Sequence, residues 1–187
     1  VSTSGQVYLS AVHYVFAGDY EIQIADLSGS LLRINTAYST ATATAAVRAG
    51  SQVEVFWGEE SGDTDGQLYR WSKGQTAPVT SAVVATNKVS ARYSSGQLHL
   101  IWYDVSRGRT GAIKYTFTEG ESFREPIEIA FWGDTSKFSG LDIAFSAGAP
   151  LLFWAADKVV KQHYPVTETT VTVLACGGRE LPAVRYY

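Results

Sequence analysis

The chain repeats one short pattern, and its clearest copy is Ser51-Gln52-Val53-Glu54-Val55-Phe56-Trp57. This apolar run ends in Trp57. A polar, glycine-containing segment follows at residues 58–66, and then a second alternating run, Gln67-Leu68-Tyr69-Arg70-Trp71. Two runs rich in β-branched and aromatic residues, separated by turn-forming residues, predict two strands joined by a hairpin loop. This strand–loop–strand unit decides how the rest of the chain is interpreted.

Three further copies of the unit occur along the chain. Residues 96–102 end in Trp102 and residues 150–154 end in Trp154, while residues 19–24 have Ile24 at the corresponding place. The aligned positions 24, 57, 102 and 154 are 33, 45 and 52 residues apart. A period in this range, with several strands in each unit, is typical of a β-propeller or a similar array.

The strand pattern predicts an all-β fold, with residues 1–187 forming one propeller domain of about four four-stranded blades, or part of a larger propeller. We expect inner strands near residues 5–16, 39–47, 89–93 and 140–145. Outer strands are expected at residues 79–84, 126–130 and 169–174. The first strand, around residues 7–9, is expected to close against the fourth blade or against the tail at 181–187, because closure removes an exposed sheet edge.

Composition narrows the classes of partner. The 187 residues are 45% hydrophobic and 18% charged, as in a folded protein. A net charge of −3 and a pI near 5.6 argue against binding to nucleic acid, which requires a basic surface. No apolar run reaches the ~18 residues of a membrane-spanning helix. The start at Val1 indicates a trimmed chain, a processed precursor or a fragment. The small polar residues after it suit a chain whose signal peptide has been removed, which predicts secretion.

The sequence contains no recognisable catalytic or cofactor motif. It has no nucleophile elbow, no phosphate-binding loop and no dinucleotide-binding glycine turn. The three histidines, His13, His99 and His163, do not have the spacing of metal ligands. We therefore predict no cofactor and no metal site, and the sequence favours a binding protein over an enzyme.

The two faces of the second strand in each unit are both apolar. Val53, Val55 and Trp57 point to one side, and Glu54 and Phe56 point to the other. Strands that are apolar on both faces belong to sheets packed between two neighbours. Glu54 and His99 then lie among apolar residues, so we expect them at strand ends in contact with water, or alternatively in a pocket.

The candidate ligand-binding residues are aromatic and polar side chains close to these strands. Flat aromatic faces can stack on a sugar ring, and acidic, amide and guanidinium groups can bind its hydroxyls. The candidates are Glu54, Tyr69, Arg70, Trp71, His99, Tyr103, Asp104 and Trp132. Trp57, Trp102 and Trp154 are at least as well explained as core residues between blades.

The repeated unit resembles the blades of the fungal fucose-specific lectin family, which are six-bladed propellers. The matching stretches are residues 53–57 with 66–71, and residues 98–103 with 111–115. The resemblance implies sugar sites between blades, built from an arginine, a glutamate and a tryptophan. Here Glu21, Glu54, His99 and Leu151 stand in the place of that arginine, and residues such as Arg70 and Lys114 in the place of that glutamate.

Three functions fit the sequence. The first is a lectin-like module that binds a glycan. The second is a propeller-pocket enzyme of secondary metabolism, such as a hetero-Diels–Alderase, which would need an apolar pocket for a small apolar molecule and few polar groups. The third is a hemopexin-like scaffold for protein partners, suggested by residues 142–145 and 152–153. We also expect that a homo-oligomer could complete the ring of blades.

Overall fold

The structure is a computed structural model of the chain. It describes residues 8–16, 19–26, 28–35, 40–61, 65–81, 86–107, 110–132, 138–156, 159–163 and 172–175. Within these ranges the chain forms sixteen β-strands and no helix, which confirms the all-β prediction. A helix long and apolar enough to cross a membrane is accordingly not found in the described ranges.

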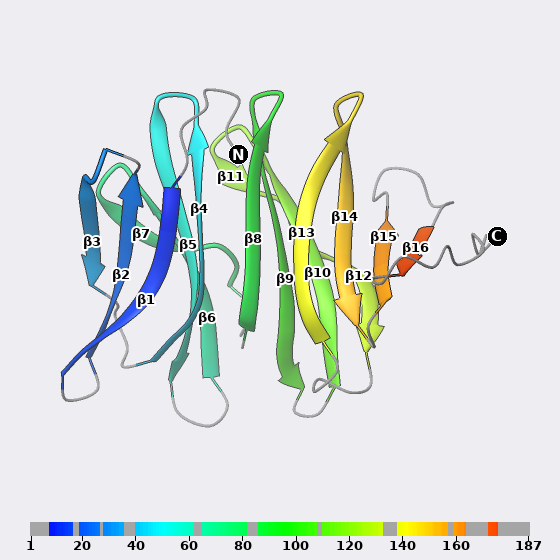
Figure 1. The fold of residues 1–187 in the computed structure, drawn as a ribbon, viewed down its shortest axis with the longest axis horizontal. Coiled ribbons are helices and arrows are strands. Elements are labelled where there is room, and N and C mark those ends of the chain that lie inside the picture. Colours follow the sequence, from blue (N-terminus) through cyan, green and yellow to red (C-terminus); the bar gives the residue numbers. More distant parts are fainter. Residues whose placement is uncertain are drawn as a thin grey trace.

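The strands form four antiparallel sheets in chain order (Figure 1). The first contains β1 (Tyr8–Phe16), β2 (Asp19–Asp26) and β3 (Leu31–Asn35), and the second contains β4 (Thr40–Ala49), β5 (Gln52–Ser61), β6 (Asp65–Ser72) and β7 (Gln75–Pro78). The third contains β8 (Thr86–Ser94), β9 (Gln97–Arg107), β10 (Thr110–Glu119), β11 (Ser122–Phe123) and β12 (Ile127–Trp132). The fourth contains β13 (Phe138–Ser146), β14 (Ala149–Ala156), β15 (Val159–His163) and β16 (Thr172–Ala175).

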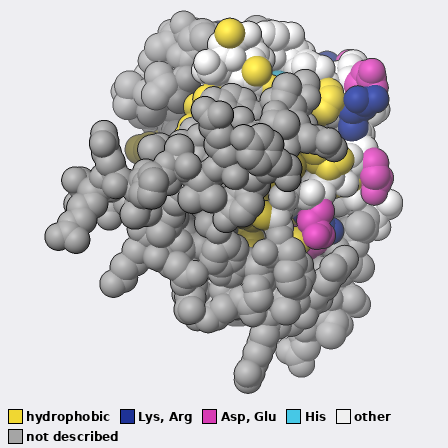
Figure 2. Space-filling model, turned by 90° about the vertical axis from the view of Figure 1, so that its right-hand side faces the viewer, with side chains coloured by type: hydrophobic (Ala, Val, Ile, Leu, Met, Phe, Trp, Pro, Cys, Tyr) yellow, Lys and Arg dark blue, Asp and Glu magenta, His cyan; other side chains and the backbone are white. Residues whose placement is uncertain are grey.

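The sheets stack face to face like the blades of a propeller, with the inner strands β1, β4, β8 and β13 following one another across the molecule (Figure 1). Each pair of consecutive sheets is joined by its own buried hydrophobic cluster. Seen from the fourth-sheet end, hydrophobic side chains of the described residues gather in the upper and middle part, and charged ones lie toward one side (Figure 2). The predicted propeller fold is therefore confirmed.

The three tryptophans occupy equivalent positions, as the sequence predicts. Trp57, Trp102 and Trp154 each lie five residues after the first residue of β5, β9 and β14. Each is buried and packs against the sheet that precedes its own. The tryptophans are thus core residues between blades, and one tryptophan-bearing face points in the same direction in every repeat from the second sheet onward.

Ile24 does not share this direction. It lies five residues after the start of β2, but it packs with Val55 and Trp57 of the following sheet. The β1–β2 pairing shifts register next to its turn, between Tyr14 and Phe16, and a one-residue difference in register turns side chains to the other face. The expected equivalence of Ile24 with the tryptophans therefore holds along the strand but is wrong for the side chain.

One expectation about the strands is wrong and another is tested only in part. The outer strand of the second sheet is Gln75–Pro78, because Lys73 and Gly74 have φ values of 52° and 83° and turn the chain back at once; residues 79–81 are not in a strand, and 82–84 lie outside the described residues. Two consecutive positive φ values are typical of a two-residue hairpin turn. At the N-terminus, Tyr8 and Leu9 pair with β2, and none of the described strands of the fourth sheet pairs with them. The expected alternative, closure against the tail at 181–187, lies outside the described residues and stays a prediction.

Candidate functional site

The predicted site residues do not form one cluster, because alternate residues of a strand point to opposite faces. Tyr69 and Trp71 of β6 pack between the first and second sheets, where Tyr69 stacks on Trp57 with ring centroids 5.7 Å apart. Arg70, between them in sequence, faces the third sheet with Glu54. Tyr103 belongs to the core between the third and fourth sheets. The side chain of Trp132 lies outside the described residues.

Glu54 and Arg70 form a closed polar group between the second and third sheets. The Arg70 Nε donates to Glu54 Oε2 at 2.8 Å, and the Ser72 hydroxyl donates to Oε1 at 2.8 Å. Arg70 also donates to the Glu121 carbonyl and lies 5.6 Å from the ring centre of Phe123. Glu54 is only 3% exposed, so its expected contact with water is wrong. A buried carboxylate is tolerated here because both oxygens are bonded.

Asp104 forms a second buried ion pair, with Lys114 at 2.9 Å. Asp104 occupies the position in β9 that Glu59 occupies in β5, seven residues after the first residue of the strand. Glu59 accepts a hydrogen bond from the Trp57 indole at 2.5 Å. The equivalent Trp102 indole nitrogen is buried with no hydrogen-bond partner among the described residues. Asp104 therefore acts as a structural partner of Lys114.

His99 is buried between the third and fourth sheets and is 5% exposed, so the strand-end expectation is wrong for it as well. Its Nδ1 lies 2.7 Å from the Tyr115 hydroxyl. Its ring stacks near Phe117 with centroids 5.9 Å apart, and Phe145 of the fourth sheet meets it edge-on at 4.9 Å. Burial lowers the pKa of His99 to about 4 and raises the pKa of Tyr115, so both are neutral near pH 7.

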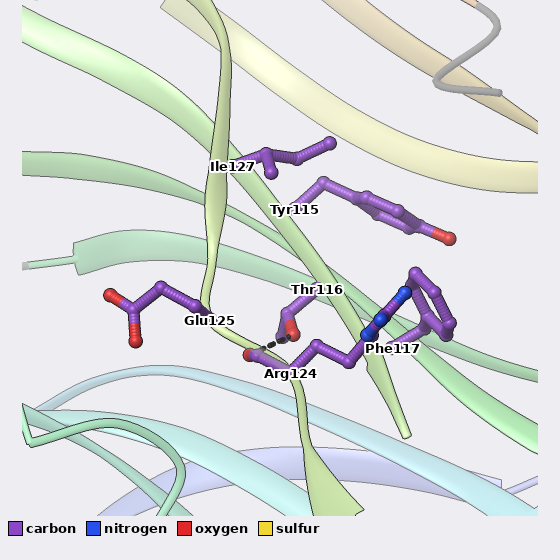
Figure 3. A pocket seen from close by; sticks show the side chains of 6 residues that line it. All are labelled: Tyr115, Thr116, Phe117, Arg124, Glu125 and Ile127. Carbon is purple, nitrogen blue, oxygen red and sulfur yellow. Dashed lines mark hydrogen bonds between the residues drawn. The ribbon is translucent and has the colours of Figure 1, made fainter. Parts of the chain in front are cut away.

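A pocket of about 400 Å³ opens at the outer edge of the third sheet (Figure 3). It is lined by Tyr115, Thr116, Phe117, Arg124, Glu125 and Ile127. It forms where the edge of β10 changes partner, since β12 pairs with residues up to Tyr115 and β11 pairs with Thr118 and Glu119. None of the eight predicted site residues lines this pocket, although His99 bonds to the lining residue Tyr115.

The segment between β11 and β12 is fixed by two hydrogen bonds. Thr116 Oγ1 donates to the Arg124 carbonyl at 2.6 Å, and the Arg124 amide donates to the Phe117 carbonyl at 3.0 Å. Figure 3 shows the side chains of Tyr115, Phe117 and Arg124 on one side of this segment and Glu125 on the other. The Arg124 guanidinium lies 5.4 Å from the ring centre of Phe117 and pairs with Glu119 at 3.3 Å. The aromatic rings and the guanidinium thus lie together on one side of the segment, and the Glu125 carboxylate lies on the other.

The pocket and the closed Glu54 group are positional counterparts in successive sheets. Glu54 and His99 each lie two residues after the start of their strand; Ser72 bonds to Glu54, and Phe117 is the register partner of His99. In the second sheet these positions carry a paired carboxylate, and in the third they carry an aromatic group. The pocket is therefore found in the third sheet, while the corresponding positions of the second sheet are filled by the Glu54 ion pair. Among the described residues no group of three or more His, Cys, Asp and Glu side chains could hold a metal ion.

Comparison with solved structures identifies proteins that share the fold of this chain. No protein-family model and no curated protein matches the sequence. Solved structures that match include a variant of the Aleuria aurantia lectin in complex with alpha-methyl-L-fucoside, at 15% identity and a TM-score of 0.55, covering 96% of this chain and 59% of the lectin. The same lectin with Fucalpha1-6GlcNAc matches at 16% identity and a TM-score of 0.54, covering 91% of this chain and 56% of the lectin.

A third structure shows how widely this fold is used. Trypanosoma rangeli sialidase in complex with sialic acid matches at 10% identity and a TM-score of 0.55, covering 92% of this chain and 36% of the sialidase. This chain therefore spans less than two thirds of the length of the lectin and of the sialidase. At these identities the comparisons show the fold, an array of propeller blades, and leave function to the site.

Proposed function

We propose that this chain is a carbohydrate-binding, lectin-like propeller whose pocket at the edge of the third sheet holds a sugar ring. The observation that supports the proposal is the pocket itself, in which the Phe117 and Tyr115 rings and Ile127 adjoin Arg124 and Glu125. The edges of the rings and Ile127 offer apolar surface to the apolar side of a sugar ring, while the guanidinium donates to its hydroxyls.

The size and composition of the pocket also support a small ligand. Its volume of about 400 Å³ lies within the range of ligand sites in proteins, and such sites combine apolar walls with a few placed polar groups. The folds of the two fucoside-bound lectin structures agree with this proposal. Because a sialidase has the same fold, the choice of sugar depends on the residues of the pocket and not on the fold.

The test is binding to a panel of immobilised glycans that includes fucosides and sialosides. We expect wild-type protein to bind at least one sugar, and Phe117→Ala and Arg124→Gln to weaken that binding. Because Arg124 is exposed, Arg124→Gln is expected to fold normally and to test the pocket even if Phe117→Ala fails to fold. Tyr69→Phe is the matched control, because Tyr69 stacks on Trp57 away from the pocket. Failure of the wild-type protein to bind any sugar on the panel would refute the proposal.

The other hypotheses stay predictions. A propeller-pocket enzyme would bind a small apolar molecule in place of the sugar. Binding of such a molecule, with no binding to any glycan of the panel, would favour the enzyme hypothesis. Secretion is tested by determining whether the natural protein is found outside the cell. A homo-oligomer that completes the ring of blades is tested by measuring the mass of the protein in solution. A hemopexin-like scaffold would bind a protein partner with the pocket variants unimpaired.

A further inference from the structure

We propose that His99 is the positioning residue of this pocket, and that its hydrogen bond fixes the Tyr115 ring that forms the buried wall. The ligand readout of this proposal rests on the proposed function, but the position of the Tyr115 ring can be observed without any ligand. His99 itself does not line the pocket, so it acts through Tyr115.

The Tyr115 ring depends on His99 for its polar partner. Tyr115 is 2% exposed, so its hydroxyl is removed from bulk water. A buried hydroxyl without a partner costs free energy, and the 2.7 Å contact with His99 Nδ1 supplies that partner. The rest of the ring adjoins the pocket beside Phe117 and Ile127 (Figure 3). One orientation of Tyr115 therefore satisfies the hydroxyl and shapes the wall at the same time.

His99 is in turn held by residues of two sheets. Phe117 of its own sheet stacks near one side of the imidazole, and Phe145 of the fourth sheet meets it edge-on. Next to it, Arg92 is the register partner of His99 on β8 and bonds to Asp142 of β13 at 2.8 Å. The pocket wall is thus linked through His99 to the interface between the third and fourth sheets.

Two substitutions separate the hydrogen bond from ring packing. His99→Phe keeps an aromatic ring between Phe117 and Phe145 but removes the nitrogen. His99→Asn loses the ring but places an amide atom at the same number of bonds from Cβ as Nδ1, so it can still bond to Tyr115. If the hydrogen bond positions Tyr115, the asparagine variant keeps the wall and the phenylalanine variant does not.

The first measurement is the affinity for alpha-methyl-L-fucoside by calorimetry, with thermal unfolding as the check on folding. We expect His99→Phe and Tyr115→Phe each to weaken binding about three- to tenfold, as the loss of one hydrogen bond predicts. The double variant should be no weaker than either single variant, because both remove the same bond. His99→Asn should stay within about twofold of wild type. Additive losses, or unchanged affinity in a folded His99→Phe protein, would overturn the proposal.

The second measurement needs no ligand and decides the proposal even if the wild-type protein does not bind this fucoside. Crystal structures of the two His99 variants should show the Tyr115 ring displaced in His99→Phe and retained in His99→Asn. An undisturbed Tyr115 in His99→Phe refutes the positioning role while leaving the carbohydrate proposal intact. Absence of fucoside binding with a displaced Tyr115 counts against that sugar as ligand and supports the role of His99.

Discussion

Acidification should destabilise this fold through His99 over a defined pH range. Burial lowers the pKa of His99 from 6.5 to about 4, so the unfolded chain binds a proton at this residue more readily than the native chain does. The stabilisation of the folded state by neutral His99 is fully present above the unfolded pKa of 6.5. It is lost progressively as the pH falls through that value toward the folded pKa of about 4.

The size of the effect follows from the two pKa values. Proton linkage gives a loss of about 2 kcal/mol at pH 5 and about 3 kcal/mol at pH 4, relative to neutral pH. That is a large part of the ~5–15 kcal/mol that stabilises a typical domain. Arg92 lies opposite His99 in the strand register and pairs with Asp142, and both residues are present in wild type and in the His99 variants. Their contribution cancels when His99 variants are compared with wild type.

The assay is urea unfolding of wild type, His99→Phe and His99→Asn between pH 4 and pH 8. Neither replacement titrates in this range, so the difference in unfolding free energy between wild type and each variant should shift by about 3 kcal/mol from pH 7 to pH 4, to the disadvantage of wild type. The two variants serve as controls for each other, since their own pH profiles should run parallel. Parallel profiles for all three proteins would refute a buried, neutral His99.

Two further substitutions test the packing of the third sheet by urea unfolding. Gly111→Ala places a Cβ 2.3 Å from the Tyr103 Cζ and hydroxyl oxygen and should cost at least ~2 kcal/mol; a smaller cost is expected in a Tyr103→Leu background, and an equal cost would contradict the clash. Lys114→Met leaves Asp104 buried without its cation and should cost about 3–5 kcal/mol, most of it recovered by adding Asp104→Leu. An additive double variant would contradict that pairing.

The sequence predicts the repeated sheets well because the signals are local. Alternation with a period of two assigns Val55 and Trp57 to one face and Phe56 to the other, and the structure places them in separate clusters. Residues that are apolar on both faces, as around Trp102, indicate a sheet packed between two others. The outer strand of the second sheet was harder to predict. The Lys73-Gly74 turn places this strand at Gln75–Pro78, before the following residues that have a higher β-propensity.

The site could not be predicted because it depends on pairing between distant segments. The pocket exists because one edge of β10 pairs with both β11 and β12. No local sequence pattern predicts that β10 changes its pairing partner along this edge. Tyr115 and Phe117 are recognisable as aromatic residues of a strand, but Arg124 and Glu125 resemble any charged connection. Similarly, Glu54 looks exposed until Arg70 and Ser72 are placed beside it by the register of β5 and β6.

We propose that a sugar binds at the outer edge of the third sheet. A backbone-amide NMR titration with the sugar that binds best on the glycan panel tests it most directly. We predict that the resonances that move will be those of residues 115–117 and 124–127, which surround the pocket. Movement confined to Glu54, Arg70 and Ser72, or to the tryptophan-bearing faces, would contradict the account.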